Sequence, residues 1–255
     1  MKLFTKETLI GRLKEIRSKG WIPNARPGNQ GGVGNTIEDL LGITENNLPI
    51  PNAAEWELKC RRIGTSLTTL FHLEPSPRAL KIVSAILLPK YGWEHQSIDG
   101  ESSFRQTISG LSRSDRGFMV VVDRAARKVL ISFDTSAVDS RHRTWLKSVK
   151  KRVGLSELDP QPYWGFDDLC SKAGTKLLNC FYVQAQARRE EGKEFFLYDK
   201  IMVLQKFSFD KLLDGIEKGY VFVDFDARTH HNHGTKFRLR QDKLPELYEI
   251  AQTVS

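Results

Sequence analysis

The segment AEWELKCRR (54–62) alternates between apolar and charged side chains. A period of two is typical of a β-strand that buries one face, whereas a helix would need a period near 3.6. On such a strand Leu58 and Cys60 point into a core, and Glu57 and Lys59 project together from the opposite side. The chain is therefore expected to build a sheet on which one carboxylate and one ammonium group share a face.

Both helical and strand periodicities occur along the rest of the chain, with no internal repeat. We predict helices over residues 5–19, 36–42, 77–88, 140–153, 208–219 and 243–253. We predict further strands over residues 68–73, 118–123, 129–134, 177–187, 194–206, 220–225 and 234–240. The alternation of the two kinds of element indicates an α/β fold with a mixed sheet.

The charge of the chain favours a polyanionic partner. The net charge is +8, and basic side chains concentrate in residues 141–152 and 228–243. The three cysteines have no CxxC spacing, no apolar run is long enough for a membrane span, and the first residues lack the apolar core of a signal peptide. We expect a reduced cytoplasmic protein of a bacterium or archaeon, with no membrane partner.

The pair Glu57 and Lys59 suits phosphodiester hydrolysis. A carboxylate holds Mg²⁺, and a neighbouring lysine positions the attacking water and offsets the negative charge of the transition state. The tripeptide alone is weak evidence, because Glu191-Gly192-Lys193 has the same spacing in a turn. The alternative interpretation is a solvated ion pair without function.

The surrounding sequence makes the functional interpretation stronger. The order Glu38, thirteen residues, Asn52, four residues, Glu57, one residue, Lys59 resembles the PD-(D/E)xK nuclease signature in its MutH-like variant. The segments GGVGNTIEDLLG (31–42), NNLPIP (46–51), EWELKCRR (55–62) and LTTLFH (67–72) resemble the MvaI/BcnI restriction endonuclease family. The resemblance is strong over residues 20–75 and looser afterwards.

The resemblance implies a restriction-endonuclease-like fold with two lobes around a DNA-binding cleft. We expect a catalytic lobe over residues 1–110 and a DNA-recognition lobe over residues 111–255, with a single interleaved domain as the alternative. The implied activity is that of a type II restriction endonuclease that cuts double-stranded DNA at a CC(W/S)GG-like site as a monomer. The implied cofactor is Mg²⁺, for which Mn²⁺ or Ca²⁺ can substitute, and the implied metal ligands are Glu38, Asn52 and Glu57, with Lys59 as the catalytic lysine.

This sequence departs from the family pattern at Asn52, which stands where the family has an aspartate. An amide oxygen carries no charge, and hard cations are held chiefly by carboxylates. We therefore expect this chain to bind DNA and to cut it slowly. Glu55 could supply the missing charge, but it lies too close to Glu57 along the strand to replace Asn52. Two alternatives stay open: a MutH-type mismatch-repair nickase, and a DNA-binding protein whose active site has decayed.

The C-terminal cationic segment is the candidate for reading bases. If residues 235–240 form a strand, Arg238 and Arg240 lie opposite its apolar face. Arginine reads guanine in the major groove, and the family resemblance implies His and Arg readers in this element. The candidates are Arg228, His230, His231, Arg238 and Arg240. A histidine zinc site and a solvated cationic strand are the alternatives.

Three further features complete the prediction. Lys147, Lys150 and Lys151 on the basic helix are expected to contact DNA phosphates rather than bases, with a solvated helix face as the alternative. His72 either faces the DNA-binding cleft or is a satisfied buried histidine. The glycine-rich loop before Glu38 lacks the Gly-Lys-Ser/Thr ending of a nucleotide-binding loop, so no nucleotide cofactor is expected.

Overall fold

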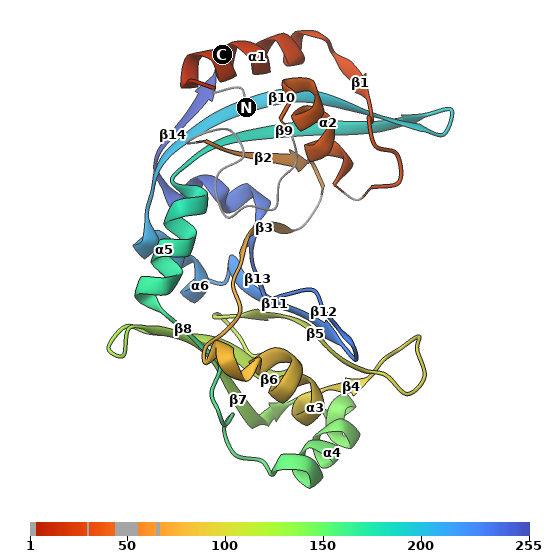
Figure 1. The fold of residues 1–255 in the computed structure, drawn as a ribbon, viewed down its shortest axis with the longest axis vertical. Helices are drawn as coiled ribbons and strands as arrows, with labels where there is room; N and C mark the ends of the chain where they lie inside the picture. Colours follow the sequence, from red (N-terminus) through yellow and green to blue (C-terminus); the bar gives the residue numbers. More distant parts are fainter. Residues whose placement is uncertain (1–3, 30, 44–55, 65–66) are drawn as a thin grey trace. The chain divides into compact units, whose positions relative to one another are not determined.

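The computed structural model describes residues 4–29, 31–43, 56–64 and 67–255, and it divides the chain into two compact units (Figure 1). Unit 1 consists of Met1–Thr68, Ala173–Ser208 and Gln241–Ser255, and unit 2 of Thr69–Lys172 and Phe209–Arg240. Each unit is therefore assembled from segments that are separated in the sequence. The mixed α/β character expected from the periodicities is confirmed in both units.

Unit 1 is built on a five-stranded mixed sheet. Four strands follow in the order β1 (Trp21–Pro23), β10 (Lys193–Phe207), β9 (Asn179–Glu190) and β2 (Glu57–Arg62), and β14 (Tyr248–Val254) also pairs with β10. β2 runs parallel to β9, and the remaining pairs are antiparallel. β9 and β10 form the predicted long hairpin, whose turn is made by Glu191 and Gly192, both with positive φ.

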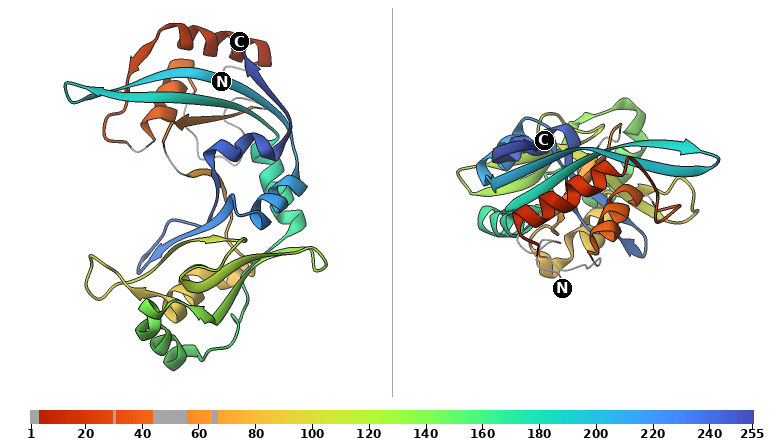
Figure 2. Two further views of the ribbon diagram at one scale, coloured as in Figure 1. Left: turned by 180° about the vertical axis from the view of Figure 1, so that it is seen from behind. Right: turned by 90° about the horizontal axis from the view of Figure 1, so that it is seen from above.

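Two helices cover one face of this sheet. α1 (Lys6–Ser18) begins at the capping residue Thr5, as predicted, and buries Leu9 and Leu13. α1 lies beside β10 in the views of Figures 1 and 2. α2 (Gly32–Leu41) begins four residues before the predicted start, because the chain already turns into the helix at Gly31 without a side-chain cap. The core between them includes Ile37, Leu41, Trp56, Leu58, Phe181, Val183 and Tyr198.

The prediction of a helix over residues 243–253 is wrong. The segment forms a 3-10 turn over Gln241–Leu247, called η4, and then the strand β14. Pro245 lies inside the segment, and a proline removes a helical hydrogen bond and clashes with the preceding turn. Pairing of β14 with β10 gives the backbone its hydrogen-bond partners, so tertiary structure decides the conformation here.

Unit 2 contains a six-stranded sheet and a three-stranded sheet. The first has the order β3 (Leu67–His72), β13 (Lys236–Arg240), β11 (Val221–Arg228), β5 (Ser102–Ser109) and β4 (Trp93–Glu94), with β12 (His231–Asn232) beside β11. β3 starts at the end of unit 1. The second consists of β6 (Arg116–Asp123), β7 (Lys128–Val138) and β8 (Tyr163–Gly165), and its first two strands form the predicted hairpin.

The helices of unit 2 are partly as predicted. α6 (Phe209–Glu217) lies within the expected range, and the basic helix consists of a 3-10 turn, η3 (Ser140–His142), followed by α4 (Arg143–Val153). The single helix predicted over 77–88 is instead a 3-10 turn η1 (Arg78–Leu80), a π-helix η2 (Ile82–Leu87) and a short α3 (Leu88–Tyr91). Lys81, with φ of 47°, interrupts the helical path between the first two.

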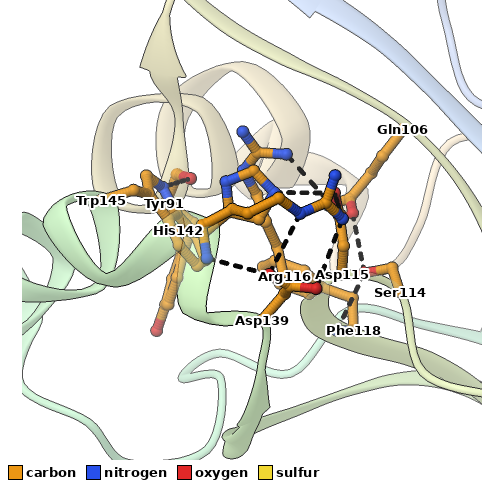
Figure 3. Close-up of polar contacts among 10 residues, drawn as sticks. Tyr91, Gln106, Ser114, Asp115, Arg116, Phe118, Asp139, His142 and Trp145 are labelled. Carbon is orange, nitrogen blue, oxygen red and sulfur yellow. Dashed lines mark hydrogen bonds and ion pairs between the residues drawn. The ribbon is translucent and has the colours of Figure 1, made fainter.

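Packing of the Trp145 ring on Phe118 and Phe133 holds α4 against the strands of unit 2. The Trp145 indole is 8% exposed, and its Nε1 donates a hydrogen bond to the Tyr91 carbonyl over 2.9 Å (Figure 3). The Arg116 guanidinium lies 3.9 Å from the ring centre of Trp93 and 5.6 Å from that of Trp145. His142 Nε2 lies 2.7 Å from a carboxylate oxygen of Asp115. The helix is thus fixed along one side.

Candidate active site

Glu57 and Lys59 form an ion pair on one face of β2. The Lys59 Nζ lies 2.9 Å from Glu57 Oε1, as their shared face requires. Glu57 is 3% exposed, so this is a buried carboxylate rather than a solvated surface charge. The interpretation of the pair as a solvated surface pair is therefore wrong. A carboxylate is kept in such a place only with a charged or hydrogen-bonded partner.

A second lysine, which the sequence analysis did not single out, reaches the same carboxylate. Lys176 lies in the last turn of α5 (Phe166–Leu177), and its Nζ is 3.0 Å from Glu57 Oε2. Leu169, Ala173 and Leu177 are fully buried at four-residue spacing, and this period would have predicted the helix. The contact itself joins residues distant in the sequence, and no local pattern indicates it.

The surroundings of Glu57 are largely apolar and shielded from water. Cys180 and Tyr182 of β9 are in register with Glu57 and Lys59. Burial, with a smaller contribution from the charge of Glu57, raises the pKa of the Cys180 thiol to about 12, and the charge of Lys59 opposes the shift. The Tyr182 hydroxyl donates to the Gln241 carbonyl over 2.7 Å. Charges on this face therefore interact in a medium of low effective dielectric constant.

Glu38 lies on α2, which packs against the other face of the sheet. The hydroxyl of Tyr198, in the core below α2, donates to the Val33 carbonyl over 2.8 Å. Burial raises the pKa of the Cys60 thiol, and the nearby charge of Glu38 contributes to the increase. Cys60 points away from the face of Glu57 by strand alternation. The structure thus brings Glu57 and Lys59 together and places Glu38 on α2, which contacts β2, while Asn52 and Glu55 lie outside the described residues.

The oxygen chemistry of Glu57 fits Mg²⁺, which takes one or two carboxylates and completes its shell with water and substrate phosphate oxygens. Glu57 Oε2 is buried and accepts no hydrogen bond from the described residues. Within those residues no three His, Cys, Asp or Glu side chains gather as a metal site. Glu57 therefore fits as one carboxylate ligand of a site that phosphate oxygens, water and position 52 would complete.

The predicted base-reading residues lie in unit 2, and two of the arginines, Arg228 and Arg238, are paired with acids. Phe237 and Leu239 of β13 are fully buried and Arg238 is partly exposed, which confirms the expected alternation. Arg238 Nη1 lies 3.4 Å from an oxygen of Asp224, and Arg228 Nη1 lies 2.6 Å from Glu101. The hydrogen bond from Arg228 is the main cause that lowers the pKa of Glu101.

The remaining basic candidates are exposed, and two of them lie near aromatic or imidazole rings. The Arg240 guanidinium is 6.0 Å from the ring centre of Phe222. His231 is exposed and stacks on His233 with ring centres 6.2 Å apart, and His230 has φ of 63° in the turn before it. His72, at the end of β3, is exposed, so the alternative of a satisfied buried histidine is wrong.

The lysines of α4 occupy its exposed side. Lys147, Lys150 and Lys151 are all exposed, whereas Val149 is fully buried. Their spacing of three and four residues places them on one side of the helix. In the described part of the chain, no helix is long and apolar enough to span a membrane.

Comparison with known proteins gives a family match and similar solved structures. The sequence profile of the MvaI/BcnI restriction endonuclease family matches residues 10–248. The structure is similar to that of the restriction endonuclease MvaI in complex with its cognate DNA substrate, with 25% identity and a TM-score of 0.78 over 99% of this chain and 100% of that chain. It is also similar to MvaI in the absence of DNA, with 25% identity and a TM-score of 0.56 over the whole of both chains. Comparison with curated protein sequences gives no significant match.

Proposed function

This chain belongs to the MvaI/BcnI restriction endonuclease family, and we propose that it is a type II endonuclease that hydrolyses double-stranded DNA at a short CC(W/S)GG-like site. The observation that carries the proposal is the buried ion pair of Glu57 and Lys59, at the spacing that resembles the nuclease signature, inside the matched range. The relative solved with its cognate DNA supports double-stranded DNA as the partner. We further propose that the chain acts as a monomer in the cytoplasm.

The proposed catalytic roles follow from the paired charges of Glu57 and Lys59 on β2. Glu57 would hold a divalent cation, with Mg²⁺ as the natural choice and Mn²⁺ or Ca²⁺ as substitutes; Glu38 and Asn52 are proposed as its further ligands. Bound there, Mg²⁺ would polarise the phosphate and lower the pKa of a water molecule. The Lys59 ammonium, 2.9 Å from Glu57 Oε1, would orient the attacking water and offset the charge that builds up on the phosphate.

We propose that unit 1 contains the catalytic residues and that unit 2 contacts the bases and the phosphates of the DNA. Arg228, His230, His231, Arg238, Arg240 and His72 are the proposed base readers. Lys147, Lys150 and Lys151 are the proposed phosphate contacts, because they are exposed on one side of a firmly attached helix. The acids beside Arg228 and Arg238 would orient these guanidinium groups in the absence of DNA.

Asn52 favours one alternative, a DNA-binding protein that no longer cleaves. The test is cleavage mapping of an unmethylated plasmid by this chain and by its Asn52→Asp variant in Mg²⁺. We expect discrete double-strand fragments from the variant at a rate at least about tenfold higher, because a carboxylate restores a charged ligand. Tight DNA binding without cleavage by the variant would support the non-catalytic alternative. Nicked circles at hemimethylated sites would support the MutH-type nickase. Equal cutting rates of the two proteins would reject the role of position 52 as a metal ligand.

A further inference from the structure

The Glu57 carboxylate is held by lysines from two different elements. Lys59 comes from the same strand, and Lys176 comes from α5. The side chain of Glu57 is 4% exposed, and those of Lys59 and Lys176 are 16% and 21% exposed. Because little water screens these charges, each ammonium group attracts the carboxylate more strongly than it would at the protein surface.

The two carboxylate oxygens are held differently. Oε1 lies 2.9 Å from Lys59 Nζ. Oε2 lies 3.0 Å from Lys176 Nζ, yet it accepts no hydrogen bond with proper geometry from the described residues. The contact with Lys176 is therefore an electrostatic attraction without the directional component of a hydrogen bond. Oε2 therefore keeps lone pairs that a cation other than Lys176 could bind.

We propose that Lys176 is a positioning residue of the nuclease site, which holds the Glu57 carboxylate in place and competes with a divalent cation for Oε2. The inference rests on the assignment of Glu57 as a metal ligand in the proposed function. An ammonium group and a divalent cation on one buried oxygen repel each other, so the metal must displace Lys176 or bind beside it at a cost in affinity.

The test is direct measurement of Mn²⁺ binding to the full chain, by the electron paramagnetic resonance signal of free Mn²⁺. A neighbouring charge shifts the equilibrium of a carboxylate by one or more factors of ten, so we expect Lys176→Met to bind Mn²⁺ about tenfold more tightly than the parent chain. Lys176→Arg keeps the charge and should stay near the parent. Lys172→Met, one turn earlier on α5, is the matched control and should also leave the affinity unchanged.

Thermal unfolding supplies a second measurement that separates the proposed role from a structural one. Without metal, Lys176→Met should melt at a lower temperature, because Glu57 loses one of its ammonium partners. On addition of Mn²⁺ its melting temperature should rise by more than that of the parent chain, because tighter binding stabilises the folded state further. A purely structural lysine would lower the melting temperature and leave the Mn²⁺ affinity as it was.

Failure of this inference and failure of the proposed function give different results. If the parent chain and Lys176→Met bind Mn²⁺ with equal affinity, or if neither binds it, the proposal that Lys176 competes with the cation for Glu57 Oε2 is overturned. The variant Glu57→Gln tests the proposed function separately, since it should lose most of the binding. If Glu57→Gln binds Mn²⁺ as the parent does, Glu57 is no ligand and the proposed catalytic assignment fails as well.

Discussion

The exposed lysines of α4 give the sharpest quantitative prediction. If Lys147, Lys150 and Lys151 each contact a DNA phosphate, replacing all three by glutamine removes three counterion-releasing contacts. Each contact contributes about 0.9 to the slope of log affinity against log salt concentration, so the slope should become shallower by about 2.7. Between about 50 and 200 mM salt, this difference corresponds to about 40-fold less salt-induced weakening in the variant than in the parent chain.

The assay is fluorescence anisotropy with a labelled duplex, titrated at several salt concentrations without divalent cations. In the described part of the chain none of the three lysines takes part in an ion pair, so their replacement should leave the fold intact, as a thermal melt can verify. A control variant with glutamine at Lys14, Lys19 and Lys206 makes the same change in net charge at exposed positions of unit 1.

The reasoning is refuted if the α4 variant keeps the parent slope while its melting temperature is unchanged. An equal decrease in both variants would also refute it, because the effect would then reflect net charge alone and not contacts made by α4. A shallower slope confined to the α4 variant would identify this helix as a phosphate-contacting surface.

Two further predictions concern stability. Gly110→Ala should unfold the protein or strongly destabilise it, because a Cβ there would lie 2.4 Å from the Ile216 carbonyl oxygen. In contrast, the Cβ of Gly174→Ala in α5 meets no atom within 4 Å, so this variant should raise the free energy of unfolding, measured in urea, by about 0.5–1 kcal/mol. Similar stabilities of the two variants would contradict the packing described. Glu101→Gln should reduce the acid sensitivity of stability. The hydrogen bond from Arg228 holds the pKa of Glu101 below its ordinary value, so its contribution is present above the unfolded-state pKa and is lost as pH falls through the folded-state pKa. Identical acid unfolding curves for Glu101→Gln and the parent would speak against this.

The sequence predicts those parts of the fold that depend on local periodicity. The alternation around Glu57 and Lys59 correctly indicates a strand with both side chains on one face, and the β9–β10 hairpin follows from two strand patterns around a glycine turn. Thr5 likewise marks the start of α1 through its capping bonds. In each case neighbours in the sequence are also neighbours in space.

The parts that were missed depend on distant segments. Residues 248–254 become a strand because β10 offers them a pairing edge, and nothing in their own sequence excludes a helix. Lys176 reaches Glu57 only through the packing of α5. The acidic partner of Arg238 could not be predicted for the same reason. Asp224 lies on β11, and it reaches Arg238 only because β11 pairs with β13 in a fixed register. The roles of Glu38 and Asn52 stay predictions.

The discontinuous make-up of unit 1 has a consequence for the order in which the protein can be completed during translation. Its sheet needs β14, which belongs to Gln241–Ser255, and every residue of unit 2 is synthesised before that segment. A nascent chain therefore carries Glu57 and Lys59 long before the last strand of their sheet exists. We expect that a ribosome-bound chain stalled before Gln241 holds an unfinished unit 1, in which the part of β10 that pairs with β14, residues 201–207, is exposed to the solvent and to chaperones along one edge.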